Sequence, residues 1–194
     1  VTLTSKLSGT YESAMSAKTM VKKKCRIEVI DSRTVAMGLG LTVITAAKAA
    51  QAGANLDELT DLVQQSLSKS HIIVYFDSLK YLAKGGRIGK AQGLLGSLLS
   101  VKPILTMKDG EVAPLTRVRS QGAGIDYLHN FAVGFSNIKE MAVEHSTGID
   151  QADKLVDRLS SVFPGERIYR STVSPVLGVH AGPNAIAVTV LEAD

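Results

Sequence analysis

Hydroxyl side chains gather close to the start of the chain, in the stretch TSKLSGTY. Thr4, Ser5, Ser8 and Thr10 lie where an extended segment leads into a helical pattern. The free N–H groups and the dipole of a helix N-terminus favour negative charge, so hydroxyl donors at this place predict an anion site. N-capping by Ser8 is the structural alternative, and the two roles are compatible.

A histidine lies close to the other end of the chain, in the stretch VLGVHAGP. The apolar residues before His180 predict a strand, and the glycine and proline after it predict a turn. Binding groups often collect where a strand ends at a turn. His180 is therefore a candidate binding residue, with a purely structural role as the alternative. The other histidines, His71, His129 and His145, are interpreted as structural or exposed.

The stretch KYLAKGGRIGK invites interpretation as a phosphate-binding loop. A P-loop needs four residues between its first glycine and the Gly-Lys pair, and a hydroxyl residue after the lysine. Here three residues separate Gly85 from Gly89, and Ala91 follows Lys90. The segment before the glycines also has a helical pattern, whereas a P-loop follows a strand. The sequence therefore argues against an NTPase.

Other chemical motifs are weak or missing. MGLGLTV has two of the three glycines of a dinucleotide fingerprint, with Val43 in the third place, and a close helix–sheet contact explains it equally well. No zinc motif and no G-x-S-x-G elbow occurs. We therefore expect no metal and no cofactor.

Composition narrows the choice of class and compartment. The net charge of +4 permits an anionic ligand or an acidic partner, but is too small to argue for nucleic acid. Cys25 is the single cysteine, which excludes an intramolecular disulfide and fits a reducing compartment, so we expect a cytoplasmic protein. No apolar run reaches the roughly 18 residues of a membrane span.

Strand and helix patterns alternate over residues 1–70. Strands are predicted at Val1–Ser5 and Cys25–Asp31, and helices at 8–20, 34–53 and after a capping box of Asn55 and Glu58. This alternation predicts an α/β arrangement, a parallel sheet covered by helices. The first residues have the pattern of a strand end, so we expect further sequence upstream.

The pattern changes over residues 71–194. Six strand candidates occur there, two of them joined by an Asp-Gly turn that predicts a hairpin. They lie at 71–77, 101–107, 111–118, 139–146, 167–182 and 183–193, with helices predicted at 122–135 and 149–162. Hairpin and crossover connections together predict an α+β domain with a mixed sheet.

Four separated motifs follow one another along nearly the whole chain. They are TSKLSGTYESA, VIDSRTVAMGLG, the stretch that contains YLAKGGRIGK, LLGSLLSVKPIL and DGEVAPLTRVRS, and GVHAGPNAIAV. Together they resemble the DegV family of bacterial fatty-acid-binding proteins. Thr4 stands where the family motif begins with serine. DegV-like proteins have an additional N-terminal segment, so the chain looks like a member without its first part.

The resemblance implies two domains in the EDD fold. Residues 1–70 would be the remainder of a Rossmann-like domain, incomplete here, and residues 71–194 an α+β domain with a mixed sheet of about six strands. A long-chain, palmitate-like fatty acid would lie at their junction. The family serine and histidine that hold its carboxylate match Ser5 and His180, whereas a threonine from the N-terminal part has no counterpart here.

The resemblance also implies an acyl-chain wall and a docking surface. The residues expected to line the acyl chain are Met37, Ile88, Leu94, Leu98 and Ile104. Some family members present the fatty acid to a fatty acid kinase, and Arg87, Arg117 and Arg119 are candidates for a basic docking surface. A solvated surface is the alternative for these arginines.

The sequence thus predicts an acyl carrier and not an enzyme. The main alternative is an enzyme that acts on a small carboxylate or a phosphorylated metabolite, with His180 as general acid or base. That alternative needs a second titratable group, which the sequence does not identify. A nucleic-acid-binding regulator ranks third because no DNA- or RNA-binding motif occurs.

Overall fold

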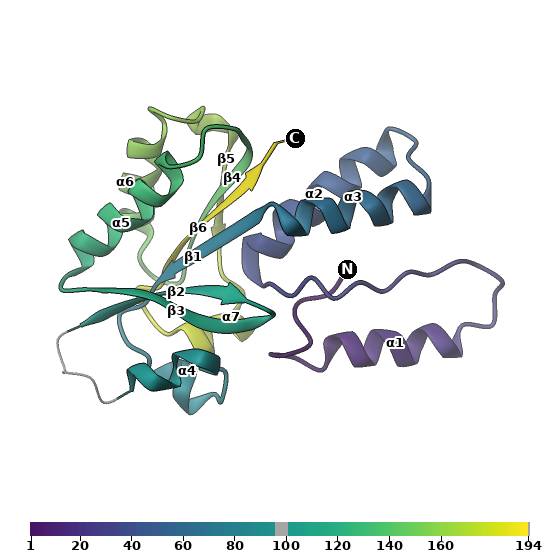
Figure 1. The fold of residues 1–194 in the computed structure, drawn as a ribbon, viewed down its shortest axis with the longest axis horizontal. Helices are drawn as coiled ribbons and strands as arrows, with labels where there is room; N and C mark the ends of the chain where they lie inside the picture. Colours follow the sequence, from purple (N-terminus) through teal and green to yellow (C-terminus); the bar gives the residue numbers. More distant parts are fainter. Residues whose placement is uncertain (96–100, 194) are drawn as a thin grey trace.

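The computed structural model describes residues 1–95 and 101–193. Its centre is a six-stranded sheet (Figure 1). The strands are β1 (Ser70–Tyr75), β2 (Lys102–Lys108), β3 (Glu111–Val118), β4 (Ile138–His145), β5 (Ile168–Thr172) and β6 (Ile186–Glu192). Their spatial order is β3-β2-β1-β6-β4-β5, and only the β4–β5 pair is parallel. The predicted mixed sheet of about six strands is confirmed.

Helices cover both faces of this sheet. They are α1 (Thr10–Met20), α2 (Ala36–Gln51), α3 (Leu56–Ser68), α4 (Lys80–Lys84), α5 (Gln121–Val133), α6 (Ile149–Leu159) and α7 (Pro175–Ala181), with 3₁₀ turns η1 (Gly89–Leu94) and η2 (Gly165–Arg167). In Figure 1, α5 and α6 pack on one face and α2 on the other, while α1 projects from the rest and buries none of its residues.

Two local signals in the sequence produce the structures they predict. Asn55 accepts hydrogen bonds from the N–H groups of Asp57 and Glu58, and the Glu58 carboxylate accepts from the Asn55 N–H, so α3 begins at a complete capping box. Asp109 and Gly110 both have positive φ, at 55° and 83°, between β2 and β3. This left-handed pair closes the predicted hairpin.

The main core lies between the sheet and the pair α5 and α6. Ile73, Tyr75 and Val188 point from the sheet into it and meet Leu128 and Leu155 from the helices, all at most 2% exposed. On the opposite face, a smaller cluster joins Leu41 of α2 to Ala142 and Leu191. The rest of that second face is free to form a pocket.

Residues 1–69 pair differently from the prediction. The two expected strands meet at one isolated parallel bridge, between Thr2 and Asp31. Thr2 N–H donates to the Ile30 carbonyl at 2.8 Å, and Ser32 N–H donates to the Thr2 carbonyl at 3.1 Å. A single bridge is too short for a ladder, so within the described residues Cys25–Asp31 forms no regular strand. The direction of pairing is parallel, and a Rossmann-like sheet here stays a prediction.

The strand predicted over residues 167–182 is wrong in its second half. β5 ends at Thr172, and α7 begins after Ser174, whose hydroxyl accepts from the Leu177 N–H. Pro175 occupies the first turn, where its fixed φ and missing N–H favour a helix. His180 therefore lies in the last turn of α7 and not at a strand end.

The glycine-rich stretch has no P-loop structure. α4 precedes it, and Gly85 is the C-cap of that helix. Gly86 and Gly89 then take positive φ values of 68° and 53° and lead into η1. Within the described part of the chain, no helix combines the length and apolar character needed to cross a membrane, and no cluster of metal-ligating side chains occurs.

Candidate ligand-binding pocket

A cavity of about 670 Å³ lies on the sheet face that α2 covers. Its floor is a row of side chains that crosses five strands. Leu105 of β2 is paired with Val74 of β1, and Val74 with Ala187 of β6. Ala187 and Ser171 flank Glu144 of β4. Paired residues share one face of a sheet, so the row is apolar at its β2 end and polar at its β5 end.

Four segments that are distant in sequence cover this floor. They are the N-terminal segment 3–10, the start of α2, the helix α7, and α4 with the loop that follows it. The side chains they contribute are Leu3, Leu7, Ser8, Thr10, Val35, Ala36, Met37, Leu82, Arg87, Val176, Leu177, His180 and Ala181. Most are apolar, so the pocket suits a hydrocarbon with one polar end.

Arg87 and His180 both contact Gly85, the C-cap of α4. The His180 imidazole lies so close to this residue that a Cβ atom there would overlap it. Arg87 donates from Nη1 to the Gly85 carbonyl at 2.7 Å and from Nε to the Leu7 carbonyl at 3.3 Å. A guanidinium and an imidazole are thereby brought together beside the N-terminal segment, which makes this part of the pocket wall suitable for an anion.

Ser8 and Thr10 continue this polar part of the wall. Their hydroxyl oxygens are 2.8 Å apart, and the Thr10 N–H donates to the Ser8 Oγ at 3.3 Å. α1 begins here without a side-chain cap at Gly9. The predicted N-capping by Ser8 is therefore wrong, because Ser8 precedes the N-cap and, among the backbone N–H groups of the described residues, accepts only from that of Thr10. The predicted anion site stays a prediction.

His180 has an unused ring nitrogen. Its Nδ1 is buried and has no hydrogen-bond partner in the described part of the chain. A buried polar atom without a partner costs free energy. This nitrogen packs against Gly85 and is closed off from the cavity, so a ligand in the pocket could reach it only if the ring turned. His180 lines the pocket, and a helix and not a strand positions it. Its contact with a carboxylate stays a prediction.

Ser5 is directed away from this pocket. Its hydroxyl donates to the Asp31 carboxylate at 2.6 Å, and its N–H lies 3.3 Å from both oxygens of that carboxylate. Burial raises the pKa of Asp31, but the hydrogen bonds from Ser5 and Arg33 outweigh that effect and hold it below its usual value. Ser5 does not line the pocket, so its contact with a carboxylate stays a prediction.

The residues expected to line the acyl chain are distributed over several places. Met37 lines the pocket. Ile88 is buried in a cluster with Leu105, and Leu94 packs against that cluster, so both support the wall from behind. Ile104 lies on the opposite face of the sheet, in the main core, and the structure does not bring it to the pocket. Leu98 lies outside the described residues.

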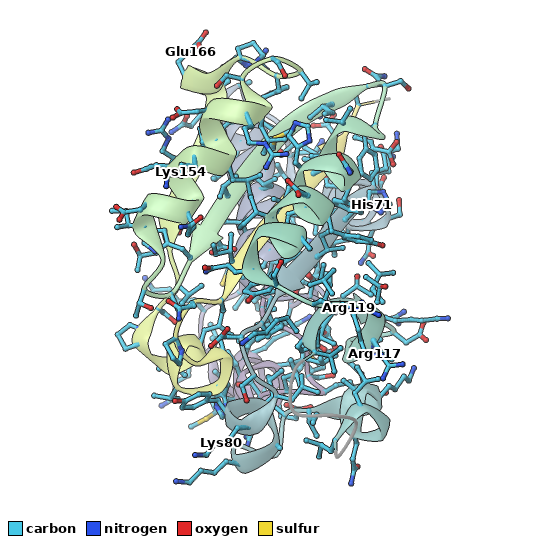
Figure 2. All side chains as sticks on the ribbon, turned by 90° about the vertical axis from the view of Figure 1, so that its left-hand side faces the viewer. His71, Lys80, Arg117, Arg119, Lys154 and Glu166 are labelled. Carbon is cyan, nitrogen blue, oxygen red and sulfur yellow. The ribbon has the colours of Figure 1, made fainter. Side chains whose placement is uncertain are left out.

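The three arginines of the expected docking surface are also separated. Arg87 is exposed, yet it lines the pocket and does not simply face outward. Arg117 and Arg119 are exposed on β3 and directly after it. Figure 2 shows these two close together on the hairpin and far from Lys154 and Glu166. Only this pair forms a candidate docking surface away from the pocket.

The sequence interpretation missed Glu144 and gave Thr4 a different role, as one of the hydroxyls of an anion site. Glu144 is 4% exposed and lines the pocket, and its carboxylate accepts from the Met37 N–H at 2.7 Å. Thr4 is fully buried and donates to the Gly110 carbonyl at 2.8 Å, which fastens the N-terminal segment to the hairpin. A signal existed for Glu144, because an acid inside the apolar strand pattern MAVEH is unusual.

A second cavity, of about 760 Å³, lies beside the first. The two share Ile72, Thr106 and Met107. Its wall is more polar and includes Asp31 and His71. The smaller cavity is the better candidate for an apolar ligand because its wall is mainly hydrocarbon.

Comparison with known proteins agrees with this geometry. The family model described as "Uncharacterised protein, DegV family" matches residues 1–193. The chain belongs to the DegV family. A DegV domain-containing protein of Caldanaerobacter subterraneus is 40% identical over 192 residues, which cover 97% of this chain and 68% of that protein. The resemblance drawn from the four motifs is thus confirmed.

Solved DegV structures share the fold. A DegV family protein from Thermus thermophilus, whose structure is described by its fatty acid binding, is 27% identical with a TM-score of 0.87, over 98% of this chain and 69% of that one. DegV from Bacillus subtilis, described as a fatty acid binding protein, is also 27% identical, with a TM-score of 0.84 over 98% and 69%.

Proposed function

We propose that this DegV protein binds a long-chain, palmitate-like fatty acid at the junction of two domains, residues 1–70 and 71–194, and acts as a carrier without catalytic activity. The observation that carries the proposal is the pocket itself. It has a mainly apolar wall that also carries the guanidinium of Arg87 and the imidazole of His180. The two DegV proteins described as fatty acid binding support it.

The proposed head-group site is the part of the wall that Arg87 and His180 share. A carboxylate there would accept charge-assisted hydrogen bonds from the guanidinium and from the imidazole. Ser8 and Thr10 can add hydroxyl donors. Ser5 can join them only if its hydroxyl exchanges Asp31 for the ligand, because that hydroxyl already donates to Asp31.

The tail and the head group contribute very different amounts to the binding free energy. Burying each CH₂ contributes ~0.8 kcal/mol, so a C16 tail contributes up to roughly 12 kcal/mol before entropic costs. A hydrogen bond to a charged group contributes about 1.5–3 kcal/mol. The tail therefore sets the affinity, and the head-group residues set the orientation.

Two measurements test fatty-acid binding. Solvent extraction of the purified protein, followed by mass spectrometry, should identify a copurified long-chain fatty acid. Titration with a fluorescent fatty acid should show that His180→Ala binds about tenfold to a hundredfold more weakly than the parent, since one charge-assisted bond is lost. Val179→Ala is the matched control, because Val179 is the neighbouring residue on α7, is 67% exposed and does not line the pocket.

The fatty-acid proposal is refuted if no fatty acid copurifies and none binds in titration. If fatty acids bind but His180→Ala does not change their affinity, the assignment of the pocket to the acyl chain is supported and the head-group assignment is wrong. Chain length follows from the same titration when it is repeated with saturated acids of increasing length.

We further propose that the bound carboxylate is presented to a fatty acid kinase that docks on Arg117 and Arg119. Both side chains are exposed and neither lines the pocket, which supports separate places for binding and docking. The cytoplasmic location expected from the single cysteine belongs to the same proposal.

One observation bears on the enzyme alternative. Glu144 lines the same pocket as His180, and burial raises the pKa of Glu144 to about 7, a value suited to acid–base catalysis. However, Glu144 accepts from the Met37 N–H, and in the described residues no hydrogen bond joins it to His180. The apolar wall also suits hydrocarbon better than a small polar metabolite. Turnover of a small carboxylate or a phosphorylated metabolite by the purified protein would favour the alternative.

A further inference from the structure

Glu144 is an acidic side chain enclosed by the proposed acyl-chain pocket. It stands in the cross-strand row of the floor, between Ala187 and Ser171 and two strands away from Val74. Only 4% of it is exposed. Any chain that fills the cavity over this row covers the carboxyl group and removes the water that reaches it.

No cation in the described residues pairs with this carboxyl group. The groups that face it are the hydroxyl of Ser171 on β5, the methyl group of Ala187 on β6 and the N–H of Met37 at the start of α2. The other charged or titratable side chains on the pocket wall are Arg87 and His180. Arg87 donates to Gly85 and Leu7 instead.

Burial already perturbs Glu144 without a ligand. Desolvation raises its pKa to about 7, and the hydrogen bonds from the Met37 N–H and the Ser171 hydroxyl oppose this rise only in part. At neutral pH the carboxyl group is therefore close to half protonated. A small additional change in its surroundings is enough to shift that balance.

We propose that an acyl chain binds in this pocket with uptake of a proton by Glu144, so that hydrocarbon lies only against the neutral carboxyl group. The inference rests on the proposed fatty-acid binding and adds a condition to it. A carboxylate covered by hydrocarbon loses its remaining hydration without gaining a partner, which is costly, whereas the neutral acid loses much less.

The sign of the pH effect follows from linkage. The liganded protein holds one more proton than the free protein wherever free Glu144 is ionised, so affinity falls as pH rises above about 7. The expected loss is about tenfold for each pH unit above that value. Below it, free Glu144 is already protonated and affinity levels off.

The experiment uses a neutral probe, so that ionisation of the ligand and its attraction to His180 play no part. The methyl ester of the fluorescent fatty acid cis-parinaric acid is titrated into parent, Glu144→Gln and His180→Gln between pH 6 and pH 9. The parent and His180→Gln should lose affinity together as pH rises. Glu144→Gln keeps an oxygen acceptor for the Met37 N–H but cannot ionise, so its affinity should be independent of pH.

Calorimetry gives a second measurement that needs no variant. Binding of the ester to the parent at about pH 8, in buffers of different ionisation enthalpy, should show uptake of close to one proton. Flat affinity in the parent, a slope retained in Glu144→Gln, or no proton uptake would each overturn the inference and leave fatty-acid binding intact. Absence of binding to both the ester and the free acid at every pH would overturn the proposed function, and this inference with it.

Discussion

At the scale of residues, the position of His180 depends on a missing side chain. The imidazole packs directly on Gly85, where a Cβ atom would overlap Nδ1. Gly85→Ala should therefore displace the imidazole and weaken binding of a fluorescent fatty acid about as much as His180→Ala does. Gly93→Ala is the control, because a Cβ atom at Gly93 meets nothing within 4 Å. If the two glycine variants bind the fatty acid equally well, His180 does not contribute to the head-group site.

A second residue-scale prediction concerns stability and Glu144. Its pKa in the folded protein is about 7, against an ordinary value of 4.5. Between these values the folded state binds more protons than the unfolded state, so the free energy of unfolding should fall as pH rises from 4.5 to 7. Urea unfolding should show a fall of up to about 3 kcal/mol in the parent.

Glu144→Gln is the comparison for this pH series. The variant should lose most of that slope between pH 4.5 and 7 because its amide does not titrate. An identical slope in parent and variant would mean that Glu144 ionises normally in the folded protein, and that its surroundings are wetter than its 4% exposure indicates.

At the scale of elements, one hydroxyl fastens the N-terminal segment to the β2–β3 hairpin. Thr4 is fully buried and donates to the Gly110 carbonyl at 2.8 Å. Thr4→Val keeps the shape of the side chain but leaves the Gly110 carbonyl without this donor, so it should lower the free energy of unfolding by about 1–3 kcal/mol in urea. Faster hydrogen exchange of the hairpin amides should accompany that loss.

Thr19→Val is the matched control for this contact. Thr19 is exposed on α1, and its hydroxyl donates to the Ser16 carbonyl within the same helix. The control should change stability by less than about 0.5 kcal/mol. If both variants behave alike, the Thr4–Gly110 bond does not hold the two elements together.

At the scale of the whole molecule, the proposed docking and binding surfaces are separate. Reversal of charge at Arg117 and Arg119 to Glu should leave fatty-acid affinity unchanged, because neither residue lines the pocket. The same change should slow acyl-phosphate formation by a purified fatty acid kinase, most strongly at low salt. An ionic-strength series with the parent and the double variant measures both effects.

The control is a second double reversal, at Lys80 and Lys154. Both are exposed, and Figure 2 shows them away from the arginine pair, on α4 and α6. Both double variants change the net charge by the same amount, so they differ only in which part of the surface is altered. If both slow the kinase equally, the effect comes from net charge and the docking surface is refuted.

Much of the fold can be predicted from the sequence, because short-range rules decide it. The Asn55–Glu58 capping box begins α3, and Asp109-Gly110 closes the hairpin through its positive φ values. The apolar patterns identify the strands of the mixed sheet, and the order of four motifs identifies the family. Each of these signals depends on residues that are close together in the chain, so it can be interpreted without the tertiary structure.

The composition of the pocket, in contrast, is decided by strand pairing and packing. Ile104 and Leu105 are adjacent and equally apolar, yet the first enters the main core and the second lines the pocket, because successive side chains of a strand point to opposite faces. A strand buried on both faces has no alternation from which the face could be read. For the same reason only the register of β4 against β5 and β6 places Glu144 on the pocket floor.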